Sequence, residues 1–229
     1  MSRNKILFIT GTDTDMGKTV VSLLVMHALA GRDAVYLKPV QTGCTDPEHD
    51  SDPAFVHRHL PGGLPHGMTA TSCIHSCRPR PKAPLFAGDP VDFKDLLHFI
   101  TGHASRHDIT VVEGAGGVFV PITQDRTMLD LAVAAKTTIL VVGRAGLGTI
   151  NHTLLTLEAI TARGADCPGV ILVDPTNAVP ERDRTENSAA IESFSDRPVL
   201  GVIGHIADLR HPESSSLTVI EKLFPLLHP

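Results

Sequence analysis

The sequence contains no tryptophan, one tyrosine and four cysteines, and it has no long hydrophobic run. Four cysteines among 229 residues are too few for a disulfide scaffold, so we expect a reducing compartment. No stretch approaches the roughly 18 apolar residues that a membrane span requires, and the apolar run near the start is too short for a signal peptide. These absences predict a cytoplasmic protein without a membrane partner.

The sequence also lacks an excess of positive charge. It has 20 Lys and Arg against 25 Asp and Glu, for a formal net charge of −5. A nucleic-acid partner is therefore not expected, because its binding would require a basic face. We find no internal repeat and no domain boundary, so we predict one domain over residues 1–229. Residues 61–90, rich in Pro, Gly, Cys and His, are expected to form an irregular excursion from it.

Short β-branched segments alternate with segments of helical periodicity. This alternation predicts an α/β fold with a mostly parallel central sheet and helices on both faces. The expected strands are residues 6–10, 34–38, 109–113, 138–142, 169–174 and 199–203, and the expected helices are residues 19–30, 96–103, 128–135, 149–163 and 216–226.

A glycine-containing loop, GTDTDMGKT at residues 11–19, lies between the first expected strand and the first expected helix. The backbone N–H groups of such a loop wrap a phosphate, and the helix N-terminus adds positive potential. Lys18 would reach the β and γ phosphates, and the Thr19 hydroxyl would ligate Mg²⁺. The usual spacing places the first glycine where this chain has Thr12, one residue after Gly11. The loop predicts a P-loop NTPase that binds a nucleoside triphosphate.

Two further expected strands end in charged residues. Lys38 begins the run KPVQTG, and Glu113 follows the hydrophobic residues 109–112. Because parallel strands end at one edge of the sheet, we expect Lys38 near the γ phosphate or an acidic substrate, and Glu113 near Mg²⁺. An acidic cluster follows Lys38, and composition does not distinguish its members: Asp46, Glu48, Asp50 and Asp52.

Five segments together resemble the dethiobiotin synthetase family: GTDTDMGKT, KPVQTG, DSDPA, VVEGAGG and GRAGLGTINHTLLT. The resemblance implies a Mg²⁺- and ATP-dependent cyclo-ligase of biotin biosynthesis that forms carbon–nitrogen bonds. Its implied substrates are 7,8-diaminononanoate, CO₂ and a nucleoside triphosphate, which react through a carbamate and a carbamic-phosphoric mixed anhydride. It also implies a homodimer with shared active sites.

The same resemblance implies roles for individual residues. The implied catalytic residues are Lys38, Lys18 and Thr12, and the implied Mg²⁺ ligands are Thr19, Asp52 and Glu113. The implied nucleotide-binding residues are Thr14, Asp15, Met16, Gly17, Lys18, Thr19, Val20, Glu113 and Asp174. The implied substrate-binding residues are Thr12, Lys38, Thr42, Gly116, Gly117 and Val118, with Gly148, Thr149, Ile150 and Asn151 supplied by the partner subunit. Val173 stands where the family often has an asparagine that reads adenine, so the preferred base stays open.

Other interpretations stay open beside this one. A zinc site would use Cys73, His75 and Cys77, with Cys44, His49 and His66 as possible further ligands, although no second paired-cysteine motif supports it. A regulatory or partitioning P-loop ATPase would carry a second lysine where this chain has Asp13. A related stand-alone synthetase would act on another amine or carboxylate, whereas a cobyrinate-type amidotransferase would add a glutaminase domain, for which we expect no room. The basic run at residues 78–82 is expected to be a solvated loop.

Overall fold

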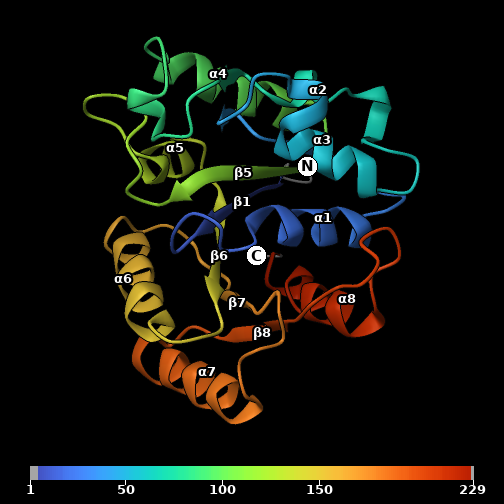
Figure 1. Ribbon diagram of the computed structural model, residues 1–229. Coiled ribbons are helices and arrows are strands. Elements are labelled where there is room, and N and C mark those ends of the chain that lie inside the picture. The colour runs from blue at the N-terminus through green and yellow to red at the C-terminus, as the bar shows by residue number, and fades with distance from the viewer. Residues whose placement is uncertain (1–4, 228–229) are drawn as a thin grey trace.

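A six-stranded sheet forms the centre of the computed structural model, which describes residues 5–227 (Figure 1). The strand order is β2-β5-β1-β6-β7-β8, and every pairing is parallel. The predicted α/β class with a parallel sheet is therefore confirmed. The strands are β1 (Lys5–Gly11), β2 (Ala34–Leu37), β5 (Ile109–Gly117), β6 (Thr138–Arg144), β7 (Val170–Val173) and β8 (Val199–Ile203).

Helices cover both faces of this sheet, and successive strand residues divide between two cores. Leu7 and Ile9 of β1 join the core beneath α1 and α8, whereas Phe8 joins the core on the other face. Both faces of each strand are thus apolar, as a buried parallel sheet requires. One face carries α1 (Lys18–Ala28), α3 (Asp52–His59) and α8 (Ser214–Glu221); the other carries α4 (Phe93–Ala104), α5 (Met128–Ala134), α6 (Thr149–Ala162) and α7 (Glu181–Ser195).

The excursion at residues 61–90 is more ordered than its composition suggests. It contains β4 (Ser76–Arg78), which pairs in parallel with β3 (Val40–Thr42) in a second, two-stranded sheet. This pairing holds the excursion beside the segment that follows Lys38. The remaining short elements are α2 (Pro47–Asp50), η1 (Pro65–Gly67), η2 (Thr71–Cys73), η3 (Pro84–Phe86) and η4 (Phe224–Leu227).

The helix α7 was not expected from the sequence. Ile191 is its one buried residue, so the helix shows almost no apolar periodicity. It packs against α6 at one end of the molecule, as Figure 1 shows. Within residues 5–227, no helix is long and apolar enough to cross a membrane.

Candidate active site at the carboxyl edge of the sheet

The phosphate loop connects β1 to α1 at the carboxyl edge of the sheet. Gly17 has the left-handed φ of 86° that turns the chain into the helix, and the Lys18 ammonium folds back to donate a hydrogen bond to the carbonyl oxygen of Asp13 at 3.1 Å. A Cβ atom at Gly11 would lie 2.5 Å from that oxygen and 2.9 Å from Lys18 Nζ. The backbone therefore needs its first glycine at position 11, which accounts for the shifted spacing at Thr12.

The carboxylate of Glu113 is the centre of a buried polar cluster behind this loop. Its side chain is 1% exposed, and its Oε1 accepts hydrogen bonds from Lys38 Nζ at 2.8 Å and Thr19 Oγ1 at 2.9 Å. Its Oε2 accepts a hydrogen bond from the hydroxyl of Tyr36 at 2.7 Å. The cluster joins β2, β5 and the first turn of α1.

Lys38 links Glu113 to a second carboxylate. Its Nζ lies 2.7 Å from Asp52 Oδ2 and donates to the carbonyl oxygen of Gly114 at 3.0 Å. Burial opposes the charge of Lys38, but Glu113 and Asp52 outweigh it and hold the pKa of Lys38 above its ordinary value. The pKa of Lys18 is lowered mainly by its burial and next by the positive charge of the nearby Lys38.

Local structure selects Asp52 from the acidic cluster. Ser51 caps α3 by accepting a hydrogen bond from Ala54 N at 3.1 Å, and Gln41 Oε1 accepts one from Asp52 N at 3.0 Å. Burial opposes the negative charge of Asp52, but the Lys38 ammonium outweighs this and lowers the pKa of Asp52. The other three acids form hydrogen bonds elsewhere: Asp46 with Glu48 N, Asp50 with Thr45, and Glu48 with the backbone N–H groups of Ala70 and Thr71.

A cavity of about 730 Å³ opens in front of this cluster. Its volume suits a small-molecule site. It brings together many of the residues that sequence reasoning selected: Thr14, Asp15, Met16, Gly17, Lys18, Thr19, Val20, Lys38, Thr42, Asp52, Glu113 and Gly116.

Comparison with known proteins identifies the family. A family model described as "AAA domain" matches residues 5–213. A protein of Anaeromyxobacter sp. (strain Fw109-5) named ATP-dependent dethiobiotin synthetase BioD is 41% identical over 89% of this chain and 91% of its own length. A protein of the same name from Mycobacterium avium (strain 104) is 40% identical over 86% of each chain. The chain belongs to the dethiobiotin synthetase family.

Solved structures share the fold of this synthetase family member at low sequence identity. The MinC:MinD cell division protein complex of Aquifex aeolicus gives a TM-score of 0.60 at 12% identity, covering 96% of each chain. A ParA family ATPase from Chlorobium tepidum gives 0.54 at 13% identity, covering 99% of this chain and 100% of its own. These likenesses confirm the P-loop NTPase fold, while the sequence relatives favour the synthetase over a partitioning ATPase.

The cavity also contains residues that sequence reasoning missed. Pro81, Lys82, Ala83 and Pro84 line it, so part of the run expected to be a solvated loop forms one wall. Gln41 lines it too, and its amide donates to the carbonyl oxygen of Thr42 at 3.2 Å. For Gln41, the one feature of the sequence that pointed to the site was its position within the segment KPVQTG. The sequence marked Tyr36 as a site residue only in that it is the single tyrosine of the chain and lies in an expected strand.

Several predicted synthetase residues lie outside the cavity wall. Thr12 donates its backbone N–H to the carbonyl oxygen of Val142 at 2.9 Å, Gly117 packs against the backbone of Gly11 and Thr12, and the Val118 side chain is buried in a core. The turn of Gly148, Thr149, Ile150 and Asn151 begins α6 and does not line this cavity within its own chain.

Asp174 also lies outside the cavity and organises its own loop. Its Oδ2 lies 2.6 Å from Arg184 Nη2 and accepts from Val179 N at 3.0 Å, while its Oδ1 accepts from Ala178 N at 3.2 Å. Val173, just before it, packs against the phosphate-loop Gly17. A role for Asp174 in nucleotide binding therefore stays a prediction.

The cysteine motif of the excursion does not converge on a metal position in residues 5–227. Cys73 is buried and Cys77 Sγ lies 3.0 Å from Cys44 Sγ, and among the described residues Cys73, His75 and Cys77 form no group of metal-ligating atoms. The zinc interpretation of these three residues is therefore wrong for this structure.

Proposed function

We propose that this chain is the ATP-dependent synthetase that closes the ureido ring of dethiobiotin in biotin biosynthesis. The observation that carries the proposal is the cluster of Lys18, Lys38, Asp52 and Glu113 at one cavity, in a chain whose relatives are named for this activity. Its substrates would be 7,8-diaminononanoate, CO₂ and ATP, and its products dethiobiotin, ADP and phosphate.

The proposed reaction has three steps. One amine of the substrate adds to CO₂ and loses a proton, which gives a carbamate. A carbamate oxygen then attacks the γ phosphorus while the bond to the β-phosphate oxygen breaks, releasing ADP and leaving a carbamic-phosphoric mixed anhydride. Finally the second amine attacks the carbamate carbon, loses a proton and expels phosphate. Such chemistry depends on alignment and on positive charge near the transferred group.

Two lysines would supply that charge. Lys18 begins α1, so its ammonium and the helix N-terminus both favour phosphate at the loop. Lys38 is held by two carboxylates and one carbonyl oxygen at the cavity wall, which keeps its ammonium charged and in place. We propose that Lys38 faces the carbamate and the γ phosphate, and that Thr42 and Gly116 contact the diamine, with Thr12, Gly117 and Val118 shaping the backbone beside them.

The residues present fit a magnesium ion. Thr19, Asp52 and Glu113 offer oxygen atoms, the ligands that Mg²⁺ prefers. Thr19 Oγ1 lies 2.9 Å from Glu113 Oε1, and the Lys38 ammonium contacts both carboxylates, so these oxygens belong to one cluster at the cavity. Bound by these three residues, Mg²⁺ would neutralise phosphate oxygens.

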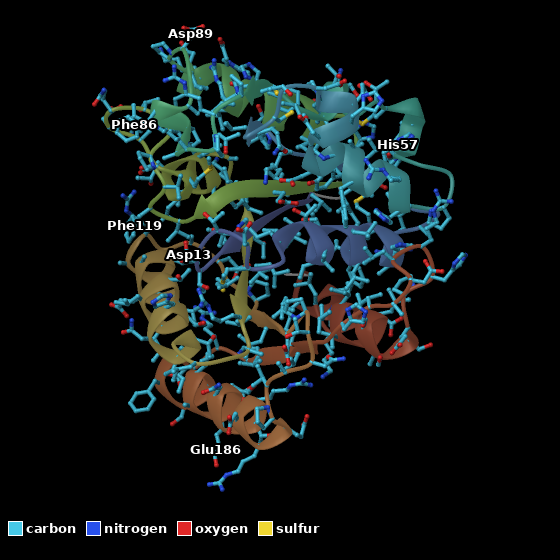
Figure 2. All side chains as sticks on the ribbon, in the orientation of Figure 1. Asp13, His57, Phe86, Asp89, Phe119 and Glu186 are labelled. Atoms are coloured by element: carbon cyan, nitrogen blue, oxygen red, sulfur yellow. The ribbon has the colours of Figure 1, made fainter. Side chains whose placement is uncertain are left out.

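We propose that the synthetase works as a homodimer. The turn of residues 148–151 begins α6 without a side-chain cap and lies outside its own cavity, so its backbone N–H groups suit the substrate carboxylate in a partner's site. Leu147 and Leu155 are 98% and 62% exposed beside it. Phe119, 63% exposed, is on the same side of the molecule as Asp13 in Figure 2. The proposed location stays cytoplasmic, with no nucleic acid or membrane as partner.

A product assay tests this function. The full chain is incubated with diaminononanoate, bicarbonate and Mg²⁺ in separate reactions with ATP, CTP and GTP, because Val173 leaves the base preference open. We expect dethiobiotin and phosphate in equal amounts with ATP. The Lys38→Ala variant should bind triphosphate and form no dethiobiotin. The proposal is wrong if neither product appears with any of the nucleotides.

A further inference from the structure

Two histidines and one aspartate meet at the edge of the sheet opposite the cavity. Asp33 immediately precedes β2, His107 closely precedes β5, and His66 lies in η1 of the excursion. Asp33 Oδ1 forms a hydrogen bond with His107 Nδ1 at 2.8 Å, and His66 Nε2 lies 3.0 Å from the same oxygen atom. Figure 1 shows β5 starting near α3, away from the phosphate loop.

The fold fixes this cluster through several separate contacts. The parallel register pairs Ala34 with Ile109, and Ile109 N donates to the carbonyl oxygen of Asp33 at 3.1 Å, which places Asp33 beside His107. The backbone of His66 has a left-handed φ of 55°, and its ring lies 4.6 Å from the His107 ring between centroids. The chain thus holds two imidazoles against one carboxylate from three distant segments.

The geometry suits a transition-metal ion. One potential ligand atom from each side chain lies within 4.8 Å of the others. Bonds of about 2.0–2.1 Å place tetrahedral zinc ligands about 3.3 Å apart. The two contacts with Asp33, 2.8 and 3.0 Å, are within a few tenths of an ångström of that spacing.

The donor set selects the class of metal. Two imidazole nitrogens with one carboxylate oxygen favour zinc and its neighbours over Mg²⁺, which prefers oxygen atoms alone. The side chains of His66 and Asp33 are 41% and 40% exposed, so an ion can enter from solvent without opening the core. His107, at 17%, supplies the buried side of the site.

We propose that Asp33, His66 and His107 bind one divalent transition-metal ion of the zinc class, with water completing the coordination. The ion links η1 of the excursion to the starts of β2 and β5. Its role is structural, because the site lies at the opposite edge of the sheet from Lys18 and Lys38.

Metal titration of the full chain tests the site, with Mg²⁺ present in excess to occupy the oxygen ligands near the phosphate loop. Bound Zn²⁺ is counted after dialysis, and Co²⁺ gives visible absorption that reports its ligands. We compare the wild type with His66→Asn, Asp33→Asn and the control His211→Asn. Asparagine tolerates the left-handed backbone at position 66, and the exposed His211 pairs with Asp208 at 2.9 Å.

We expect one equivalent of Zn²⁺, and the Co²⁺ absorption, to be lost in His66→Asn and in Asp33→Asn and kept in His211→Asn. Zn²⁺ at about 100 times its dissociation constant should favour the folded wild type by about 100-fold, raising the melting temperature by roughly 5–10 °C. Dethiobiotin synthesis should be unchanged in His66→Asn. Equal zinc content in all four proteins, or a loss in His211→Asn matching that in His66→Asn, would overturn the proposal.

Discussion

Replacing Lys38 by methionine tests whether the buried charge cluster is organised as described. Methionine keeps most of the length of the side chain and removes its charge. Lys38 is 4% exposed and contacts Glu113 at 2.8 Å, Asp52 at 2.7 Å and the Gly114 carbonyl oxygen at 3.0 Å. The substitution therefore leaves Glu113 charged, buried and without its ammonium partner.

The size of the effect follows from burial. Removing one partner of a buried ion pair costs about 3–5 kcal/mol, because the remaining charge is left uncompensated. The Asp52 side chain is 30% exposed and regains water, so Glu113, at 1%, accounts for most of the loss. We expect the free energy of unfolding to fall by about 3 kcal/mol, which lowers the urea midpoint by about 1 M.

The assay is urea unfolding followed by circular dichroism, without Mg²⁺ or nucleotide, for Lys38→Met, Glu113→Gln and the double variant. Glutamine keeps an acceptor for Tyr36 and Thr19 but carries no charge. The double variant should therefore recover about 2 kcal/mol relative to the sum of the single losses. A loss below about 1 kcal/mol in Lys38→Met, typical of exposed pairs, or additive losses in the double variant, would refute the reasoning.

Further predictions concern neighbouring contacts. Lys18→Ala should weaken ATP binding by about 100-fold in calorimetry, since a charge-assisted contact with phosphate is lost; unchanged affinity would contradict the assigned loop. Tyr36→Phe should lower the free energy of unfolding by about 1–3 kcal/mol, because Glu113 Oε2 loses its hydrogen-bond donor; an unaltered urea midpoint would count against this. For Asp174, burial opposes the charge but hydrogen bonds, including that from Arg184, outweigh it and lower its pKa. The stabilisation it gives is therefore present above its unfolded pKa of about 3.9 and is lost as the pH falls through its lower folded pKa. In Asp174→Asn, the free energy of unfolding should therefore fall less steeply below about pH 4 than in the wild type. The same pH dependence in both proteins would show that Asp174 does not cause the loss of stability in acid.

Much of the fold could be predicted because apolar strands of a parallel sheet are visible in the sequence. The six expected strands all appear, since each is a short apolar run whose side chains pack into the cores on the two faces of the sheet. The helix α7 could not be predicted, because its single buried residue, Ile191, leaves no periodic pattern. The helix α3 was missed because it has only eight residues and three of its last four are His57, Arg58 and His59.

The residues of the candidate site also divide into those that could be predicted from the sequence and those that could not. Lys18 and Glu113 could be placed because each belongs to a motif at the end of a strand. Composition did not separate Asp52 from its acidic neighbours; Gln41 and the α3 cap decide its position, and both depend on tertiary structure. The wall from Pro81 to Pro84 depends on the pairing of β3 with β4, which joins segments more than 30 residues apart.

The oxygen atoms of phosphate test the central claim most directly. With ¹⁸O-labelled bicarbonate, a brief reaction with diaminononanoate, ATP and Mg²⁺ is stopped before the label exchanges with water, and the phosphate is measured by mass spectrometry. If the carbamate attacks the γ phosphate, each phosphate released with dethiobiotin carries one labelled oxygen from CO₂. Phosphate without the label, formed at the same rate as dethiobiotin, would contradict the account.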